Sequence, residues 1–235
     1  MTMQLQIWSD YACPYCYIGK AHLDQALAEF EHADEVEIIF RAFELDSNAG
    51  PEVNTTTQGR IESKYRKTPA AAREMIDRII SMGAAAGLDM KYYDVRYTNT
   101  FDAHRLTKFA ETKGLATPMA MRLFRAYFTD LAELANHEVL AGLAVEVGLD
   151  RDEVLEMLAS DRFTREARND ESQAMQMGIQ GVPMFAFDET TMLGGAQPKE
   201  TLLRALRETW AKQQATAAAA EVPMCGIDGC AVPSN

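Results

Sequence analysis

The sequence is poor in basic residues. Lys and Arg total 23 against 35 Asp and Glu, which gives a formal net charge of −12 and a pI near 4.8. A protein that binds nucleic acid or an anionic membrane surface needs a basic face, so this balance argues against both kinds of partner. The chain also lacks any apolar stretch of about 20 residues, the length that crosses a bilayer, and it has no internal repeat.

The N-terminal segment MTMQLQIWSD lacks the pattern of a secretory signal. The first basic residue is Lys20, and the apolar run before it has only the length of a strand. We therefore expect a cytoplasmic protein. Cysteine is scarce as well: the four cysteines form two close pairs, Cys13/Cys16 and Cys225/Cys230. A reducing compartment disfavours structural disulfides, so paired cysteines there are more often catalytic or metal-binding.

The N-terminal part of the chain predicts an α/β fold. With 235 residues, of which 47% are hydrophobic, the chain is long enough for one domain with a sizeable insertion. The patterns predict a strand over residues 4–8, a helix from Cys16 towards Phe30 and a second strand over residues 36–45. Together these elements form a β-α-β unit, with the first cysteine pair at the first strand-to-helix turn.

The character of the chain changes after residue 46. Residues 48–60 read as a polar loop, and the segments after it have helical patterns, several of which end in glycine as helices often do. These segments are residues 69–87, 101–114, 118–130, 136–148, 152–160 and 163–178, and the glycines are Gly87, Gly114, Gly148 and Gly178. So much helix exceeds one crossover connection, and we interpret residues 47–177 as an inserted helical subdomain.

The β pattern returns near the C-terminus. Residues 182–187 and 191–195 flank a short acidic turn and predict an antiparallel hairpin. Pro198 then begins a final amphipathic helix. Residues 1–46 and 178–216 are thus predicted to form the two parts of one fold, followed by an irregular tail over residues 217–235.

The segment Cys13-Pro14-Tyr15-Cys16 predicts redox chemistry. A helix N-terminus carries partial positive charge and unpaired backbone N–H groups, which stabilise a thiolate on Cys13, the nucleophilic form of cysteine. Cys16 lies one turn further into the helix, where it would attack the mixed disulfide and release the product. Pro14 suits the first helical turn, and Tyr15 is placed to contact a substrate. The alternatives are a pair of incidental thiols and a zinc centre with four thiolate ligands from both pairs.

Gly181-Val182-Pro183 directly precedes the first strand of the predicted hairpin. Proline removes a donor from a strand, and an ordinary trans proline at a strand edge is one interpretation. Considered together with Cys13 and Cys16, a cis Val182–Pro183 bond is favoured. It leaves the backbone of Val182 free to pair with a substrate peptide beside the cysteines.

These motifs resemble one known family. The CPYC segment after a first strand, the long helical insertion, GIQGVPMF (residues 178–185), the hairpin and the last helix resemble the DsbA-like branch of the thioredoxin superfamily. More narrowly, SDYACPYCYIG, NTFDAHRL (residues 99–106) and GIQGVPMFAF resemble FrnE-type dithiol oxidoreductases. The resemblance implies a thioredoxin fold with a helical insertion, a nucleophilic Cys13, a resolving Cys16 and a cis-proline loop at Pro183. Some FrnE-type members have a second C-terminal pair with the spacing of Cys225 and Cys230.

Two further features keep alternatives open. Cys225 and Cys230 are either a second redox pair that exchanges electrons with Cys13/Cys16 or a structural clip on the tail. His104 either faces the active site and assists proton transfer or has a surface or capping role.

The leading hypothesis is a thiol-disulfide oxidoreductase or isomerase without a prosthetic group or metal. Its expected partners are protein thiols or disulfides and an unidentified recycling partner, with glutathione as a candidate co-substrate. One alternative is a glutathione-dependent enzyme of the 2-hydroxychromene-2-carboxylate isomerase or kappa-class transferase type, which shares the architecture but typically has serine in place of Cys13. The other alternative is the zinc-binding module.

Overall fold

The structure, a computed structural model, describes residues 2–188 and 190–220. The elements in chain order are β1 (Met3–Ser9), α1 (Pro14–Leu27), the 3-10 turn η1 (Ala33–Glu35), β2 (Val36–Ala42), α2 (Thr57–Tyr65), α3 (Pro69–Ala85), α4 (Phe101–Glu111), α5 (Ala116–Phe128), α6 (His137–Glu146), α7 (Arg151–Ala159), α8 (Thr164–Gln176), β3 (Met184–Ala186), β4 (Met192–Gly194) and α9 (Lys199–Ala220). Within the described ranges, no helix has both the length and the apolar character to cross a membrane.

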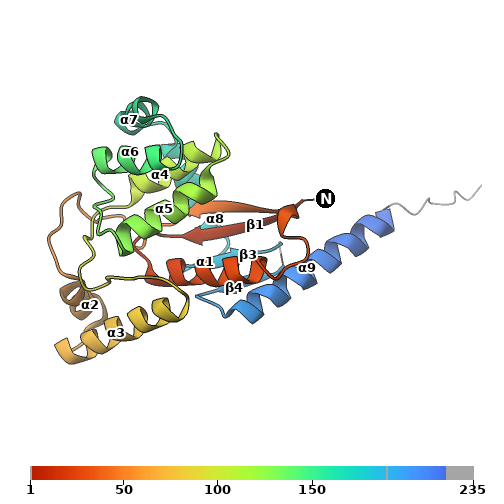
Figure 1. The fold of residues 1–235 in the computed structure, drawn as a ribbon, viewed down its shortest axis with the longest axis horizontal. Coiled ribbons are helices and arrows are strands. Elements are labelled where there is room, and N and C mark those ends of the chain that lie inside the picture. Colours follow the sequence, from red (N-terminus) through yellow and green to blue (C-terminus); the bar gives the residue numbers. More distant parts are fainter. Residues whose placement is uncertain (1, 189, 221–235) are drawn as a thin grey trace, which may run out of the picture.

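Four strands form one mixed sheet in the order β2-β1-β3-β4 (Figure 1). β1 pairs in parallel with β2 and antiparallel with β3, so Ile7 lies between Phe40 and Phe185. β3 and β4 form an antiparallel hairpin. The predicted β-α-β unit, the hairpin and the final helix are therefore confirmed.

The two faces of β1 pack against different helices because side chains alternate along a strand. Leu5 and Ile7 point into the main core, which also contains residues of α1 and α9. Trp8 points to the opposite face and packs against Ala174 of α8, and its indole N–H donates to the carbonyl oxygen of Asp170 at 3.1 Å. The sheet is therefore covered on both faces.

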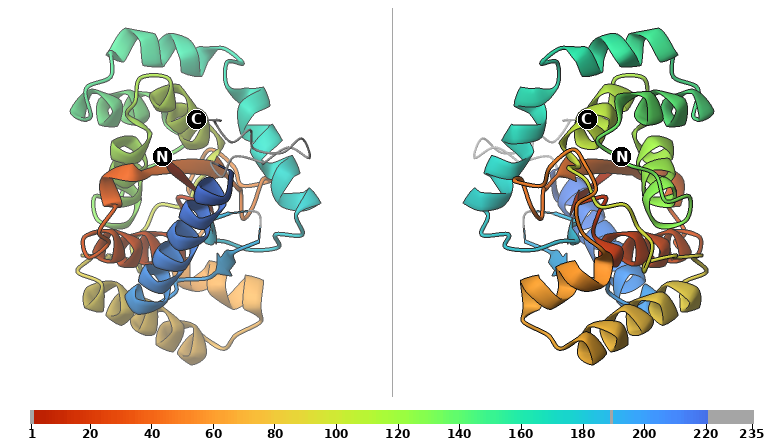
Figure 2. Two further views of the ribbon diagram at one scale, coloured as in Figure 1. Left: turned by 90° about the vertical axis from the view of Figure 1, so that its right-hand side faces the viewer. Right: turned by 90° about the vertical axis from the view of Figure 1, so that its left-hand side faces the viewer.

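The helices α2 to α8 lie between β2 and β3 in the chain, as predicted for residues 47–177. In Figures 1 and 2, α3 lies at one end of the molecule and α7 at the other, with the sheet between them. The division of the chain into four segments stays a prediction.

The buried carboxylate of Asp170 ties this helical segment to the sheet. Arg41 and Lys108 lie 3.0 and 2.7 Å from its two oxygens, and the Ala42 backbone N–H donates to it at 3.0 Å. Asp170 is on α8, Lys108 on α4, and the other two residues on β2. One carboxylate therefore joins three elements that are far apart in the sequence.

Several predicted boundaries were wrong. α9 continues to Ala220, so residues 217–220, predicted to belong to an irregular tail, are helical. α1 begins at Pro14 rather than Cys16, because Cys13 takes the N-cap position and Pro14 the first helical one. β2 ends at Ala42 rather than at residue 45, because its partner β1 ends opposite Ala42. α2 begins inside the predicted loop of residues 48–60, because the Thr56 side chain caps it by accepting the N–H of Gly59.

The glycines predicted to end helices are confirmed. Each has a positive φ, between 71° and 95°, a region that other residues rarely adopt. They are Gly87, Gly114, Gly148 and Gly178.

The last helix runs along α1 and then beyond it. Just before its start, the backbone carbonyl oxygen of Gln197 accepts a hydrogen bond of 2.8 Å from Nδ1 of His22, in the middle of α1. Further along, Trp210 stacks on His32, past the end of α1, with ring centroids 4.3 Å apart. The later turns of α9 therefore point away from the N-terminus of α1 (Figure 1).

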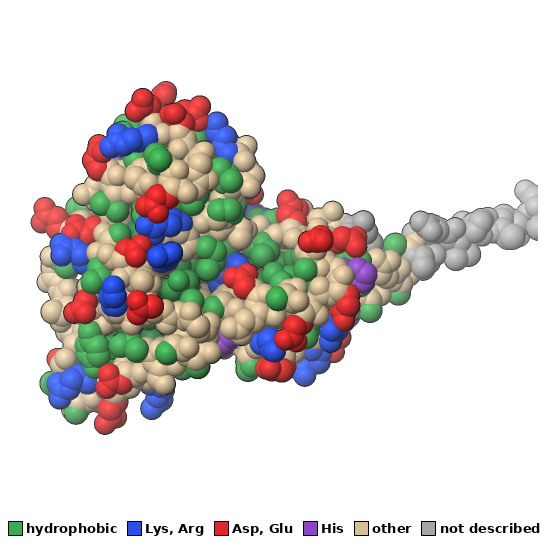
Figure 3. Space-filling model, viewed as in Figure 1, with side chains coloured by type: hydrophobic (Ala, Val, Ile, Leu, Met, Phe, Trp, Pro, Cys, Tyr) green, Lys and Arg blue, Asp and Glu red, His purple; other side chains and the backbone are tan. Residues whose placement is uncertain are grey.

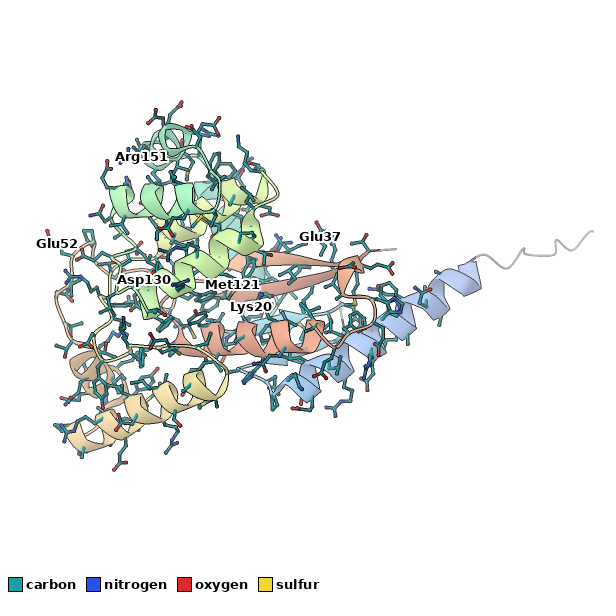
Figure 4. All side chains as sticks on the ribbon, in the orientation of Figure 1. Lys20, Glu37, Glu52, Met121, Asp130 and Arg151 are labelled. Carbon is teal, nitrogen blue, oxygen red and sulfur yellow. The ribbon has the colours of Figure 1, made fainter. Side chains whose placement is uncertain are left out.

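Charged side chains of both signs are interspersed on the face shown in Figure 3. Figure 4 shows Asp130 and Arg151 on the helical layer and Lys20 on α1 below it. Lys20 is buried, and it is held by an ion pair with Asp24 one turn later.

Candidate functional site

The dithiol lies where β1 ends and α1 begins. Cys13 is the N-cap residue of α1, and its backbone N–H donates to the carbonyl oxygen of Asp10 at 3.0 Å. The N–H of Cys16 donates to the carbonyl oxygen of Cys13 at 3.1 Å. Both cysteines are buried free thiols, with 3% and 2% of their surface exposed. The first turn of α1 therefore holds the two sulfurs on one face of the helix.

The Cys16 thiol is protonated more strongly than an ordinary cysteine. Its pKa is raised well above the usual value by burial, by a hydrogen bond with Cys13 and by the charges of Cys13 and Asp10. Cys16 therefore keeps its proton at neutral pH. The order in which Cys13 attacks and Cys16 resolves stays a prediction.

The segment predicted to contact substrate lies against Cys13. The Val182–Pro183 peptide bond is cis, as the sequence predicts. The Cys13 thiol donates to the carbonyl oxygen of Val182, with Sγ and O 3.5 Å apart. The backbone N–H of Val182 makes no hydrogen bond within the described part of the chain. A hydrogen-bonding group of the backbone is thus left free beside the nucleophile.

Gly19 allows the cis-proline segment to lie this close to α1. A Cβ atom on Gly19 would lie 3.1 Å from the Phe185 ring and 3.2 Å from Cγ of Pro183. Both distances are shorter than ordinary packing contacts. The small residue one turn after Cys16 therefore sets how closely the two parts of the site approach.

A buried polar group that the sequence analysis missed lies behind the dithiol. One carboxylate oxygen of Asp10 accepts the N–H of Ala12 at 3.1 Å, and the other accepts the N–H of Leu45 at 2.7 Å. Burial acts to raise the pKa of Asp10, but His104 and these two donors outweigh it, and the pKa lies below the usual value. The sequence feature that could have revealed this group is an aspartate directly after the first strand, three residues before Cys13.

His104 lies within this buried group. Its Nε2 atom is 3.9 Å from a carboxylate oxygen of Asp10, and its ring centroid is 4.8 Å from that of Tyr11. The alternative of a surface role is wrong, because only 3% of His104 is exposed. A part in proton transfer stays a prediction.

A cavity of about 650 Å³ opens beside Cys13. Its walls come from the start of α1, the loop after β2, α2, α3, the segment before α4 and the residues before Pro183. The lining residues are Ala12, Cys13, Pro14, Tyr15, Leu45, Asp46, Thr55, Gly59, Arg60, Ile61, Ser63, Lys64, Tyr65, Met75, Ile79, Tyr92, Tyr97, Gly181 and Val182. The structure thus brings Cys13, Pro14, Tyr15 and Val182 together, as predicted, and adds a wall from the helical insertion that sequence patterns did not reveal.

The second cysteine pair lies outside the described residues. Cys225 and Cys230 come after α9 in the chain. The described residues contain no group of three or more His, Cys, Asp or Glu placed to hold a metal ion.

A family model described as the DSBA-like thioredoxin domain matches residues 4–207. The chain is 25% identical to the protein YwbO of Bacillus subtilis over 217 residues, which cover 91% of this chain and all of YwbO.

Two solved structures share the fold of this chain. One is the crystal structure of a probable DsbA oxidoreductase, SCO1869 from Streptomyces coelicolor, whose sequence is 36% identical to this one. The match covers 99% of this chain and 100% of that chain, with a TM-score of 0.85. A 2-hydroxychromene-2-carboxylate isomerase structure shares the fold with a TM-score of 0.67 at 13% identity, covering 92% of this chain and 99% of its own.

Proposed function

The chain belongs to the DsbA-like thioredoxin domain family, and from this premise we propose that it is a thiol-disulfide oxidoreductase acting on protein disulfides through Cys13 and Cys16. The observation that supports this most is the contact between Cys13 and Val182. The Cys13 sulfur lies at the start of α1, 3.5 Å from the Val182 carbonyl oxygen, with a protonated Cys16 behind it. A nucleophile, a resolving thiol and a backbone docking group therefore occupy one site.

The proposed reaction proceeds in two exchanges. The Cys13 thiolate attacks one sulfur of a substrate disulfide, which forms a Cys13–substrate disulfide and releases the other substrate sulfur as a thiol after it takes up a proton. Cys16 then loses its proton and attacks the Cys13 sulfur. This releases the second substrate thiol and leaves a Cys13–Cys16 disulfide. Two electrons pass from the protein to the substrate, and the reverse sequence oxidises a substrate dithiol.

The cis-proline segment has a positioning role in this proposal. An extended substrate peptide pairs with the free N–H of Val182, in the manner of strand addition to a sheet edge. This pairing places the substrate sulfur over Cys13, and Tyr15 on the cavity wall contacts its side chains.

Reduction of insulin disulfides by dithiothreitol tests the proposal. We expect the protein to accelerate this reaction, Cys13→Ser to abolish the acceleration, and Cys16→Ser to accumulate a Cys13–substrate disulfide that mass spectrometry detects. Cys225→Ser, which keeps both cysteines of the CPYC site, reports separately whether the second pair takes part. Full activity of Cys13→Ser would refute the proposal.

The cavity supports a second candidate, glutathione-dependent isomerisation or transfer on a small organic molecule. Its volume of about 650 Å³ suits a small-molecule ligand. The Cys13/Cys16 pair favours the redox proposal, because a reaction of this second kind needs no change in the redox state of either thiol. Turnover of a small substrate with both thiols reduced throughout would favour the second candidate.

A further inference from the structure

Cys16 must lose a proton before it can attack the disulfide between Cys13 and a substrate. Burial opposes this loss, because it is the main reason that the pKa of Cys16 lies well above the usual value. Only 2% of Cys16 is exposed, so bulk water has little access to its sulfur. A buried thiol that ionises during the reaction therefore needs a proton acceptor inside the protein.

An ionisable pair lies next to Cys16, formed by Asp10 directly after β1 and His104 on α4. The negative charge of Asp10 acts to raise the pKa of Cys16, after the larger effects of burial and of Cys13. Nε2 of His104 lies 3.9 Å from a carboxylate oxygen of Asp10, and both side chains are 3% exposed. This nitrogen makes no hydrogen bond to another group in the described part of the chain. Asp10 thus interacts with the resolving thiol on one side and with a histidine on the other.

The phenol groups around this pair do not exchange protons near neutral pH. The ring of Tyr11 packs against that of His104, and burial raises the pKa of Tyr11. Tyr97 and Tyr127 also interact with the Asp10 charge, and burial raises the pKa of both. An ordinary tyrosine already keeps its proton until about pH 10. These hydroxyl groups therefore cannot accept the Cys16 proton.

The cations on α4 on either side of His104 are paired with other carboxylates. Arg105 lies 2.7 Å from Asp102. Lys108, one turn after His104, lies 2.7 Å from Asp170. Neither arginine nor lysine takes up a proton near neutral pH, because both are already charged, whereas a histidine changes its charge between about pH 5 and 8. His104 is therefore the group on this helix with the chemistry of a proton acceptor.

We propose that His104 takes up a proton as Cys16 ionises, and that the Asp10 carboxylate couples the two events. The Cys16 thiol loses one proton and Nε2 of His104 gains one, so the buried site acquires a thiolate and an imidazolium without a change in net charge. Without His104, a thiolate would form beside the Asp10 carboxylate, and two buried negative charges of this kind repel each other strongly. His104 acts through Asp10 and is therefore a positioning residue for the second exchange.

The inference rests on the proposed function and adds the proton to its second exchange. The Cys16 thiolate attacks the Cys13 sulfur, the bond between these two sulfurs forms, and the bond from Cys13 to the substrate breaks. Its electron pair leaves with the substrate sulfur, which takes up a proton from water. His104 then returns its proton to water, because the thiolate charge that favoured the imidazolium has gone. One proton is thus transferred overall from Cys16 to the released substrate thiol.

Stopped-flow absorbance with a nitrobenzoate disulfide, whose thiolate product is coloured, separates the two exchanges. The parent sample is the reduced full-length chain with Cys225 and Cys230 replaced by serine, so that all the colour comes from the CPYC site. Attack by Cys13 releases the first coloured thiolate in a phase whose rate depends on the reagent concentration. Attack by Cys16 releases the second in a phase whose rate does not depend on it.

At neutral pH, His104→Gln should slow the second phase at least about tenfold and leave the first phase within about twofold. The pH profile of the second phase should change as well. In the parent chain its rate should be nearly constant above neutral pH, because the proton stays within the site. In His104→Gln the rate should rise by about tenfold per pH unit, because Cys16 must then lose its proton to water.

Tyr11→Phe is the matched control. It changes the ring that packs against His104 and removes the hydrogen bond between Tyr11 and Thr107, but it removes no group that titrates near neutral pH. Both phases should stay within about twofold of the parent chain, with the same shallow pH profile.

A second phase of His104→Gln as fast as that of the parent chain would overturn the role of His104, and so would equal slowing of both phases. If His104→Gln does not fold, the parent chain decides alone: a second phase that rises by about tenfold per pH unit through the neutral range would overturn the role. Absence of any second phase in the parent chain would refute the redox proposal itself. A normal second phase that is indifferent to His104 leaves the redox proposal intact.

Discussion

Replacing Asp10 by Asn should destabilise the protein and alter the resolving thiol. The Asp10 carboxylate is buried and accepts two backbone N–H groups, one from Ala12 in the turn before α1 and one from Leu45 at the cavity wall. Asparagine has one acceptor oxygen, and its NH₂ group must face the other donor. The substitution therefore removes one charge-assisted hydrogen bond and leaves a buried N–H unpaired.

The expected loss of unfolding free energy is about 2–4 kcal/mol. A hydrogen bond to a charged group contributes about 1.5–3 kcal/mol, and a buried donor left without a partner adds about 1 kcal/mol. For a domain of this size, each kcal/mol shifts Tm by about 2–4 °C, so Tm should fall by roughly 5–15 °C.

The difference in unfolding free energy between the unaltered protein and Asp10→Asn should depend on pH. The pKa of Asp10 is lower in the folded state than its ordinary value of 3.8. The carboxylate therefore contributes stability that is fully present above the ordinary pKa and is lost as the pH falls through the lower folded value. The gap between the unaltered protein and Asp10→Asn should be constant near neutral pH and narrow below about pH 4.

Asp10→Asn should also act on Cys16. Burial is the main reason that the pKa of Cys16 is raised, and the negative charge of Asp10 adds to it. Without that charge, Cys16 should ionise at lower pH, which thiolate ultraviolet absorbance measures in a Cys13→Ser background.

Asp34→Asn is the control, because it removes the same charge from an exposed position on η1. Thermal unfolding over a pH series gives the main readout. The reasoning about Asp10 is refuted if Asp10→Asn and Asp34→Asn have the same Tm at neutral pH, or if the gap between Asp10→Asn and the unaltered protein widens in acid.

Three other substitutions test separate parts of the structure. Gly19→Ala should destabilise the protein by about 1–2 kcal/mol in urea unfolding, because crowding against Phe185 outweighs the gain in helix propensity; a more stable variant would show that the ring moves aside. Lys108→Met should cost about 3 kcal/mol in the same assay, since it removes a cation that faces a buried carboxylate; a loss below about 1 kcal/mol would show that the remaining partners suffice. Replacing both Cys225 and Cys230 by serine should leave the rate of a single substrate exchange at the CPYC site within about twofold, because one exchange needs only Cys13 and Cys16. A large decrease would favour a coupled second redox pair.

Local patterns predicted the parts of the fold that depend on neighbouring residues. The helix ends at Gly87 and Gly148 follow from the ability of glycine to adopt positive φ. The predicted start of α1 was two residues too late. Cys13 is the N-cap residue but makes no side-chain hydrogen bond to the helix, so its residue type does not indicate a helix start.

Local sequence patterns could not predict contacts between distant segments of the chain. Asp170 looks like an ordinary polar residue on a helix, yet it pairs with Arg41 and Lys108 from two other elements. Asp10 and His104 are separated by more than ninety residues, and nothing in either local sequence indicates that they meet. A buried charge is recognised only when the elements that surround it are placed.

By itself, the sequence placed a pair of cysteines at the start of α1 and predicted most of the elements in their order. Two cysteines one helical turn apart, at the point where a strand becomes a helix, require only local geometry to lie together. Only the tertiary structure decided what faces them. It brought Val182 to 3.5 Å from Cys13, placed Arg60 in the same cavity and buried Asp10 behind the dithiol. These relations depend on how the helical insertion packs against the sheet, because burial and long-range charge are properties of the assembled chain and not of any one segment.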